Sequence, residues 1–192
     1  MTNPTVALFL APGCEEIEAL TVADILFRAG IACDTISVAE GREVTSSHQI
    51  TIVANKHIDE ADLDAYDMLV LPGGLPGTPN LHANEKLMAA VHAFAEAARP
   101  LSAICAAPSI FAEEGLLKGR RATSNPGFHH VLAERGAELV ADEPVVVDGN
   151  FTTSQGMGTA IDFALEIVRR FKGDAAVEEM KPKIVYWDKT TC

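Results

Sequence analysis

The chain has 192 residues, 48% of them hydrophobic and 22% charged, which is typical of a folded protein and excludes a disordered one. Fifteen basic residues stand against 27 acidic ones, giving a formal net charge of −12. Such a surface repels phosphate backbones, so we expect no nucleic-acid partner. The length predicts a single domain over residues 1–192 with one substantial core.

The sequence shows no recognisable signal peptide and no paired cysteine spacing, so we expect a cytoplasmic protein. The N-terminal run MTNPTVALFLAPG has no positively charged segment before its short apolar stretch, so it favours a strand over a signal peptide. The uncharged stretch 68–84 contains three prolines and three glycines and cannot form a membrane helix. Cysteines 14, 33, 105 and 192 show no C-x-x-C spacing, and we expect them to stay reduced.

Strands and helices alternate along the chain. In chain order we predict strand 5–11, helix 15–30, strands 32–39 and 50–55, strand 67–74 ending in a glycine turn, helix 84–98, strand 101–105, helix 107–117, short strand 121–124, hairpin 145–154 and a final amphipathic helix 158–171. This alternation predicts an α/β sandwich with a mostly parallel sheet. The tail after residue 173 is ambiguous, although KIVYW suggests packing against the body.

Three turns follow strands of the predicted sheet: 12–18, 72–74 and 104–106. Open sheets of this class bind ligands beyond the carboxyl ends of their strands, so we expect these turns to converge on a site. Gly73 and Gly74 permit a turn that a Cβ would obstruct, and their amides could bind an oxyanion. The same sequence is also compatible with an ordinary turn.

Cys105 lies between a predicted strand and a helix whose first turn contains Pro108. Unpaired amides and the positive end of a helix dipole favour the thiolate, which is the nucleophilic form of cysteine. Free cysteine is also among the most buried residue types, so an inert core role remains an equal alternative from the residues alone.

Glu18 falls on the apolar stripe of the predicted helix 15–30, together with Val22 and Ile25. A carboxyl group there must be paired, or its pKa rises and it becomes a neutral donor. The alternative is a first-turn acid that favours the helix dipole. Leu20 and Phe27 lie away from this stripe and suggest a second apolar contact, such as a partner subunit.

Four segments occur together in order: APGCEEIEA (11–19), VLPGGLPG (70–77), AICAAP (103–108) and TSQGMGTAIDFAL (153–165). This combination resembles the ThiJ/PfpI superfamily, and within it the DJ-one branch, over nearly the whole chain. The resemblance implies a flavodoxin-like three-layer sandwich, a homodimer and a reactive cysteine on a nucleophile elbow.

The resemblance also implies roles for individual residues. Cys105 matches the nucleophilic, oxidisable cysteine, and Glu18 matches the protonated acid that hydrogen-bonds its sulfur. Gly74 and Ala106 match residues whose backbone amides line the anion pocket.

Two positions depart from the family pattern and are candidate accessory residues. Where many relatives have histidine before proline, this chain has Asn125, and an amide cannot act as a general base near neutral pH. Where relatives often have an arginine that reaches the site from the neighbouring subunit, this chain has His48, which would bring a titratable group there.

The resemblance implies a cysteine enzyme without a cofactor that acts on reactive 2-oxoaldehydes, either as a glutathione-independent glyoxalase or as a protein deglycase, in oxidative or carbonyl stress. Its substrates would be small aldehydes or glycated protein side chains. The alternative is a redox sensor or redox-linked chaperone that works through oxidation of Cys105. An amidase or peptidase is disfavoured because Ala106 stands where those branches carry histidine. The spacing of acids and cysteines predicts no metal site.

Overall fold

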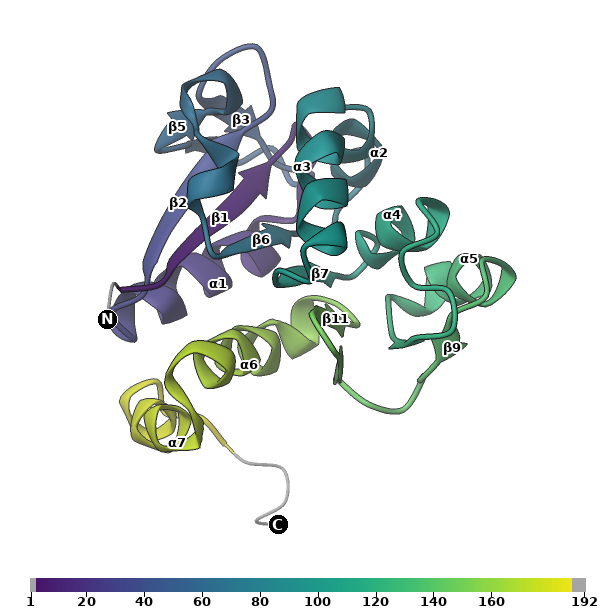
Figure 1. The fold of residues 1–192 in the computed structure, drawn as a ribbon. Coiled ribbons are helices and arrows are strands. Elements are labelled where there is room, and N and C mark those ends of the chain that lie inside the picture. The colour runs from purple at the N-terminus through teal and green to yellow at the C-terminus, as the bar shows by residue number, and fades with distance from the viewer. Residues whose placement is uncertain (1–2, 188–192) are drawn as a thin grey trace.

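The computed structural model describes residues 3–187, in which a seven-stranded sheet lies between two layers of helices (Figure 1). The strands stand in the order β10 (Val145–Asp148), β11 (Phe151–Ser154), β7 (Leu101–Ile104), β6 (Met68–Leu71), β1 (Thr5–Leu10), β2 (Ala32–Ser37) and β5 (Lys56–His57). Neighbouring strands are parallel apart from the hairpin β10–β11. The predicted α/β sandwich with a mostly parallel sheet is confirmed.

Helices cover both faces of the sheet (Figure 1). They are α1 (Glu16–Arg28), α2 (Gly77–His82), α3 (Glu85–Glu96), α4 (Pro108–Glu113), α5 (His129–Glu134), α6 (Ala160–Lys172) and α7 (Asp174–Lys183). The buried apolar side chains that α1, α6 and α7 contribute belong to one cluster, and those that α2, α3 and α4 contribute to the core, such as Leu81, Phe94 and Phe111, belong to another. These two clusters form the two sides of the core.

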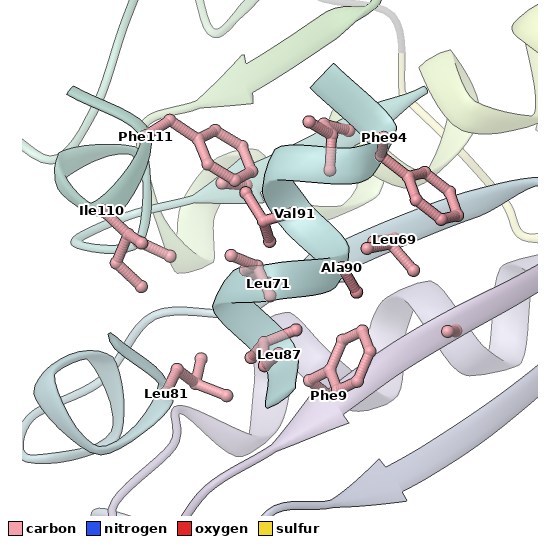
Figure 2. Packing of buried hydrophobic residues seen from close by; sticks show 14 of the residues in the cluster. Phe9, Leu69, Leu71, Leu81, Leu87, Ala90, Val91, Phe94, Ile110 and Phe111 are labelled. Atoms are coloured by element: carbon pink, nitrogen blue, oxygen red, sulfur yellow. The ribbon is translucent and has the colours of Figure 1, made fainter. Parts of the chain in front are cut away.

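The strand β1 contributes alternate residues to the two sides of the core, as the two-residue period of a strand requires. Leu8 and Leu10 belong to the cluster with α1 and α6, whereas Phe9 belongs to the cluster with α3. Figure 2 shows this second cluster, in which Phe9 and Leu71 of the sheet lie near Leu87 of α3. Because both faces are covered, β1 and β6 are buried almost throughout, and their carboxyl ends stay fixed.

Two predicted strands lie outside the main sheet. The segment predicted at 50–55 contains β4 (Thr51–Val53), which pairs with β3 (Glu43–Thr45), and the segment at 121–124 contains β8 (Arg121–Ala122), which pairs with β9 (Glu138–Leu139). The strands β3, β5 and β9 were not predicted. They are two or three residues long, too short to show a hydrophobic period.

The prediction that 158–171 is the final helix is wrong, because α7 follows α6 across Gly173, whose φ of 78° allows the reversal. The expected packing of the tail is found in part. Ile184 and Tyr186 pack against the core, whereas Trp187 is 83% exposed. Cys192 lies outside the described residues. Among residues 3–187, no helix has both the length and the apolar character that crossing a membrane would need.

Candidate active site

Cys105 occupies a strained turn between β7 and α4, with a backbone φ of 65°. Residues other than glycine rarely adopt this backbone conformation, so the surrounding structure must hold the backbone of Cys105 in place. Its amide donates to the carbonyl of Ser154 at 3.0 Å, and its carbonyl accepts from the amide of Asn125 at 2.8 Å. Both backbone groups of Cys105 are therefore fixed, and the thiol is held on a nucleophile elbow.

Glu18 reaches the elbow from the first turn of α1 and is 1% exposed. Its Oε2 accepts a hydrogen bond from the amide of Gly73 at 2.9 Å, and its carboxyl group also interacts with the Cys105 thiol and the amide of Met157. The amide of Glu18 is capped by Oε2 of Glu15 at 2.7 Å. The burial of Glu18 confirms its place on the apolar stripe of the helix, and this side of the helix brings the carboxyl group to the Cys105 turn.

The glycine turn after β6 closes the site on a third side. A Cβ at Gly73 would lie 2.6 Å from the Cβ of Cys105 and 2.8 Å from Oε2 of Glu18. Gly74 has a φ of 97°, and a Cβ there would lie 2.4 Å from the amide nitrogen of Glu15. Both positions require glycine so that the three turns can converge, which confirms the expected meeting of 12–18, 72–74 and 104–106.

The pKa values of the two central groups are raised by burial. Burial raises the pKa of Glu18 to about 7, and hydrogen bonds from Cys105 and Gly73 lower it only in part. Burial and the neighbouring Glu18 charge raise the pKa of Cys105 to about 12, against the lowering effect of the Ala106 and Gly74 amides. The amides therefore favour the thiolate, as expected, but burial and the neighbouring Glu18 charge outweigh them and raise the pKa of Cys105.

Asn125 lies beside this pair. A Cβ built on Gly156 would lie 3.7 Å from Nδ2 of Asn125, 3.8 Å from Oε1 of Glu18 and 3.9 Å from Sγ of Cys105. Side-chain atoms of these three residues therefore gather on the side of Gly156 that a side chain would occupy. A nucleophile, an acid and an amide donor gathered in this way can add to a carbonyl carbon and hold its oxygen atoms.

The DJ-1/PfpI family matches residues 4–170 of this chain. The chain belongs to the DJ-1/PfpI family. It is similar to the Drosophila melanogaster protein DJ-1beta, whose crystal structure superposes with a TM-score of 0.92 at 32% identity, covering 97% of this chain and 100% of that one.

Two further members of the DJ-1/PfpI family place the chain among its relatives. The Arabidopsis thaliana protein DJ-1 homolog B is 39% identical over 172 residues, which cover 89% of this chain and 39% of that protein, so the chain spans about two fifths of its length. A Thermococcus kodakarensis protein named deglycase TK1284 is 33% identical over 165 residues, covering 85% of this chain and 97% of that protein.

His48 stands where the family resemblance implied an arginine, and within this chain it contacts Glu16 instead of the central Glu18. Its Nδ1 lies 2.9 Å from Oε1 of Glu16 and 4.0 Å from Oε1 of Glu15, and its side chain is 65% exposed. Ligand-type atoms of these three residues lie within 4.8 Å of one another, a grouping that sequence spacing did not show because His48 is 32 residues away from Glu16. The role of His48 across a subunit interface stays a prediction.

Two contributors to the site were missed at the sequence level. The Ser154 carbonyl accepts the hydrogen bond from the Cys105 amide, and Gly156 lies beside the side chains of Asn125, Glu18 and Cys105 with no side chain of its own. Both lie in the segment 153–165 that carried the family resemblance, and the strand–glycine sequence Ser154-Gln155-Gly156 was the available signal. Backbone contacts between β11 and the elbow depend on strand order, which local sequence does not determine.

Proposed function

We propose that this chain is a cysteine enzyme, working without a cofactor, that converts reactive 2-oxoaldehydes into 2-hydroxy acids, as a glutathione-independent glyoxalase or as a deglycase acting on the early adducts of the same aldehydes. The observation that carries this proposal is the contact between the Cys105 thiol and the buried Glu18 carboxyl group, beside the amides of Gly74 and Ala106. A relative at 33% identity is named a deglycase, which supports the proposal.

The first step joins the sulfur to the aldehyde carbon. The thiol proton of Cys105 passes to the Glu18 carboxylate as the S–C bond forms and the C=O π electrons move to the oxygen. The amides of Gly74 and Ala106 stabilise the oxyanion, which then takes the proton from Glu18 to give a hemithioacetal. Because the Glu18 pKa is about 7, this group both accepts and donates a proton near neutral pH.

The next steps move hydrogen within the adduct and then release the product from Cys105. Glu18 removes the proton from C1, and the electron pair forms an enediolate with its charge on the C2 oxygen. Glu18 returns that proton to C2, and the C1 hydroxyl proton moves to the C2 oxygen, so C1 is oxidised to a thioester while C2 is reduced. Water cleaves the thioester to a 2-hydroxy acid and restores the Cys105 thiol.

A second candidate function uses the same geometry without turnover. Cys105 is half-buried, so a small oxidant can reach its sulfur. Two oxygen atoms added there would be held by the protonated Glu18 and the Gly74 and Ala106 amides, as expected for a redox sensor or redox-linked chaperone. An amidase or peptidase is a poorer match because Asn125 offers no base beside Cys105.

One experiment separates these functions. Wild type, Cys105→Ser and the control Cys33→Ser are incubated with methylglyoxal in the absence of glutathione, and lactate is followed; intact masses are taken in parallel after mild peroxide treatment. The proposal expects lactate from wild type and Cys33→Ser and none from Cys105→Ser. No lactate from wild type, together with two oxygen atoms added at Cys105, would replace the enzyme with the sensor.

A homodimer is also part of the proposal. The side of α1 that faces away from the core exposes Phe27 at 83%, Ile17 at 46% and Leu20 at 40%. Apolar side chains gathered on one helix face are typical of a protein–protein interface. Sedimentation of wild type against Phe27→Glu tests the interface, with a dimer expected for the former and monomers for the latter.

A further inference from the structure

The first turn of α1 contains one half of a capping box. Glu15 is the N-cap residue, and its Oε2 accepts a hydrogen bond from the amide of Glu18, three residues further on, at 2.7 Å. In the complete motif, the side chain of that third residue returns a bond to the amide of the cap residue. Here the Glu18 carboxyl group turns instead to the Gly73 amide and the Cys105 thiol. The side chain that would close the box is therefore directed into the candidate active site.

Gly73 supplies both bonds that the box leaves open. Its carbonyl accepts from the amide of Glu15 at 2.9 Å, and its amide donates to Oε2 of Glu18 at 2.9 Å. Together with the Glu15 cap, these bonds make a closed ring of three hydrogen bonds through Glu15, Gly73 and Glu18. The ring joins the first turn of α1 to the glycine turn after β6, and it fixes one oxygen atom of the Glu18 carboxyl group.

Glu15 also brings a buried charge to this ring, since it is 9% exposed. The residues favoured at an N-cap are serine, threonine, asparagine and aspartate, so capping alone does not require glutamate. Compared with serine, glutamate adds a negative charge. Burial raises the pKa of Glu18 most, and the charge of Glu15 raises it further, because a second negative charge so close by is repelled.

The other titratable groups around the ring leave this charge in place. His48 lies 4.0 Å from Oε1 of Glu15 but 2.9 Å from Oε1 of Glu16, so an imidazolium there pairs mainly with Glu16. The Cys105 thiol faces Glu18 from the elbow, and its hydrogen bond lowers the pKa of Glu18. Among these groups, Glu15 supplies the charge that favours a proton on Glu18.

We propose that Glu15 is a positioning residue for the reaction: through the ring it directs the Glu18 carboxyl group towards Cys105, and its negative charge keeps a proton on that carboxyl group near neutral pH. This inference rests on the proposed function, in which Glu18 takes a proton from the sulfur and returns it to the substrate. Without the charge of Glu15, Glu18 ionises at a lower pH and returns the proton less readily.

The test compares Glu15→Asp, Glu15→Ser and Glu15→Gln with wild type. Aspartate keeps both the cap and the charge, serine keeps the cap without the charge, and glutamine keeps the length and an acceptor without the charge. Glu16→Gln is the matched control, because it removes a buried charge from the next residue, whose carboxylate contacts His48. Thermal melts of the four variants report any loss of folding.

The measurement is the NMR titration of the Glu18 side-chain carboxyl carbon, assigned by its loss in Glu18→Gln. We expect the midpoint, near 7 in wild type, to stay in place in Glu15→Asp and Glu16→Gln. In Glu15→Gln and Glu15→Ser it should fall by about half a pH unit or more, as expected when one nearby like charge is removed. The acidic limb of the pH profile of lactate formation should move with it, because ionised Glu18 accepts the thiol proton.

Two outcomes overturn the inference: an unchanged midpoint in both Glu15→Gln and Glu15→Ser, or an equal fall in Glu15→Asp or Glu16→Gln, which would show that the charge of Glu15 is not the cause. The titration does not depend on turnover, so the inference and the proposed function fail separately. Lactate formation with an unchanged midpoint removes the role of Glu15 and leaves the enzyme. A lowered midpoint in a protein that forms no lactate keeps the hold of Glu15 on the proton and removes the enzyme.

Discussion

Glu16 and Glu18 stand two residues apart on α1 and are 6% and 1% exposed, yet their pKa values move in opposite directions. Burial acts to raise both. At Glu16, hydrogen bonds from its own amide, His48 and Ser46 outweigh burial and lower the pKa. At Glu18, burial outweighs the hydrogen bonds and raises the pKa to about 7. Residues two apart on a helix point to different sides. The neighbours that each side meets, more than depth alone, determine which carboxyl group keeps a proton.

The largest expected difference between the two acids is in activity. Glu18→Gln keeps an acceptor for the Gly73 amide and a donor for sulfur but cannot transfer a proton, so we expect kcat/KM for methylglyoxal to fall about 10²–10⁴-fold. Glu16→Gln is the matched control and should change the rate less than about threefold. Lactate kinetics measure both. Equal losses in the two variants would contradict the distinction.

Much of this site could be predicted because its parts are marked locally. The strand–helix junction at Cys105, the paired glycines and the position of Glu18 on an apolar stripe are each visible within a few residues. The main sheet was predictable for the same reason, since β1 and β6 are continuous apolar runs bounded by turn residues.

What local sequence did not show depends on contacts between distant segments. The link between His48 and Glu16 joins a loop to a helix 32 residues away, and the net pKa shift of Cys105 depends on burial that its junction does not reveal. The helix α7 was missed because its pattern is mostly polar; Val177 and Met180 are its buried residues.

The next expected difference between Glu18 and Glu16 is in how each changes the free energy of unfolding with pH. The folded pKa of Glu18, about 7, lies above its ordinary value of 4.5, so the folded protein keeps a proton that the unfolded chain releases. The contribution of Glu18 to the free energy of unfolding is complete below about pH 4.5 and is lost as pH rises towards 7. Relative to Glu18→Gln, wild type should lose roughly 3 kcal/mol over this range.

Glu16 supplies the control for this measurement, because its lowered pKa gives the opposite sign. Its contribution is present above the ordinary value of 4.5 and is lost as pH falls below it. Urea titrations of wild type, Glu16→Gln and Glu18→Gln at a series of pH values measure both effects. Parallel curves for wild type and Glu18→Gln would show that Glu18 titrates normally.

The smallest expected effect is that of His48→Ala. Removing the imidazole removes a hydrogen bond and a positive charge that lower the pKa of Glu16, so that pKa should rise, while the titration of Glu18 stays in place. NMR of the glutamate side-chain carboxyl carbons against pH reports both groups. A shift of Glu18 as large as that of Glu16 would show that the two sites are coupled. A changed pH profile of lactate formation would support the predicted role of His48 across a subunit interface.

The measurement that bears most directly on the account is infrared spectroscopy of the protonated carboxyl C=O stretch between about pH 5.5 and pH 8.5, a range in which an ordinary glutamate is already ionised. We predict a buried carboxyl band that disappears with a midpoint near 7, is absent from Glu18→Gln and persists in Glu16→Gln. A spectrum without this band, or a band abolished by Glu16→Gln and retained in Glu18→Gln, would contradict the claim that Glu18 keeps its proton near neutral pH.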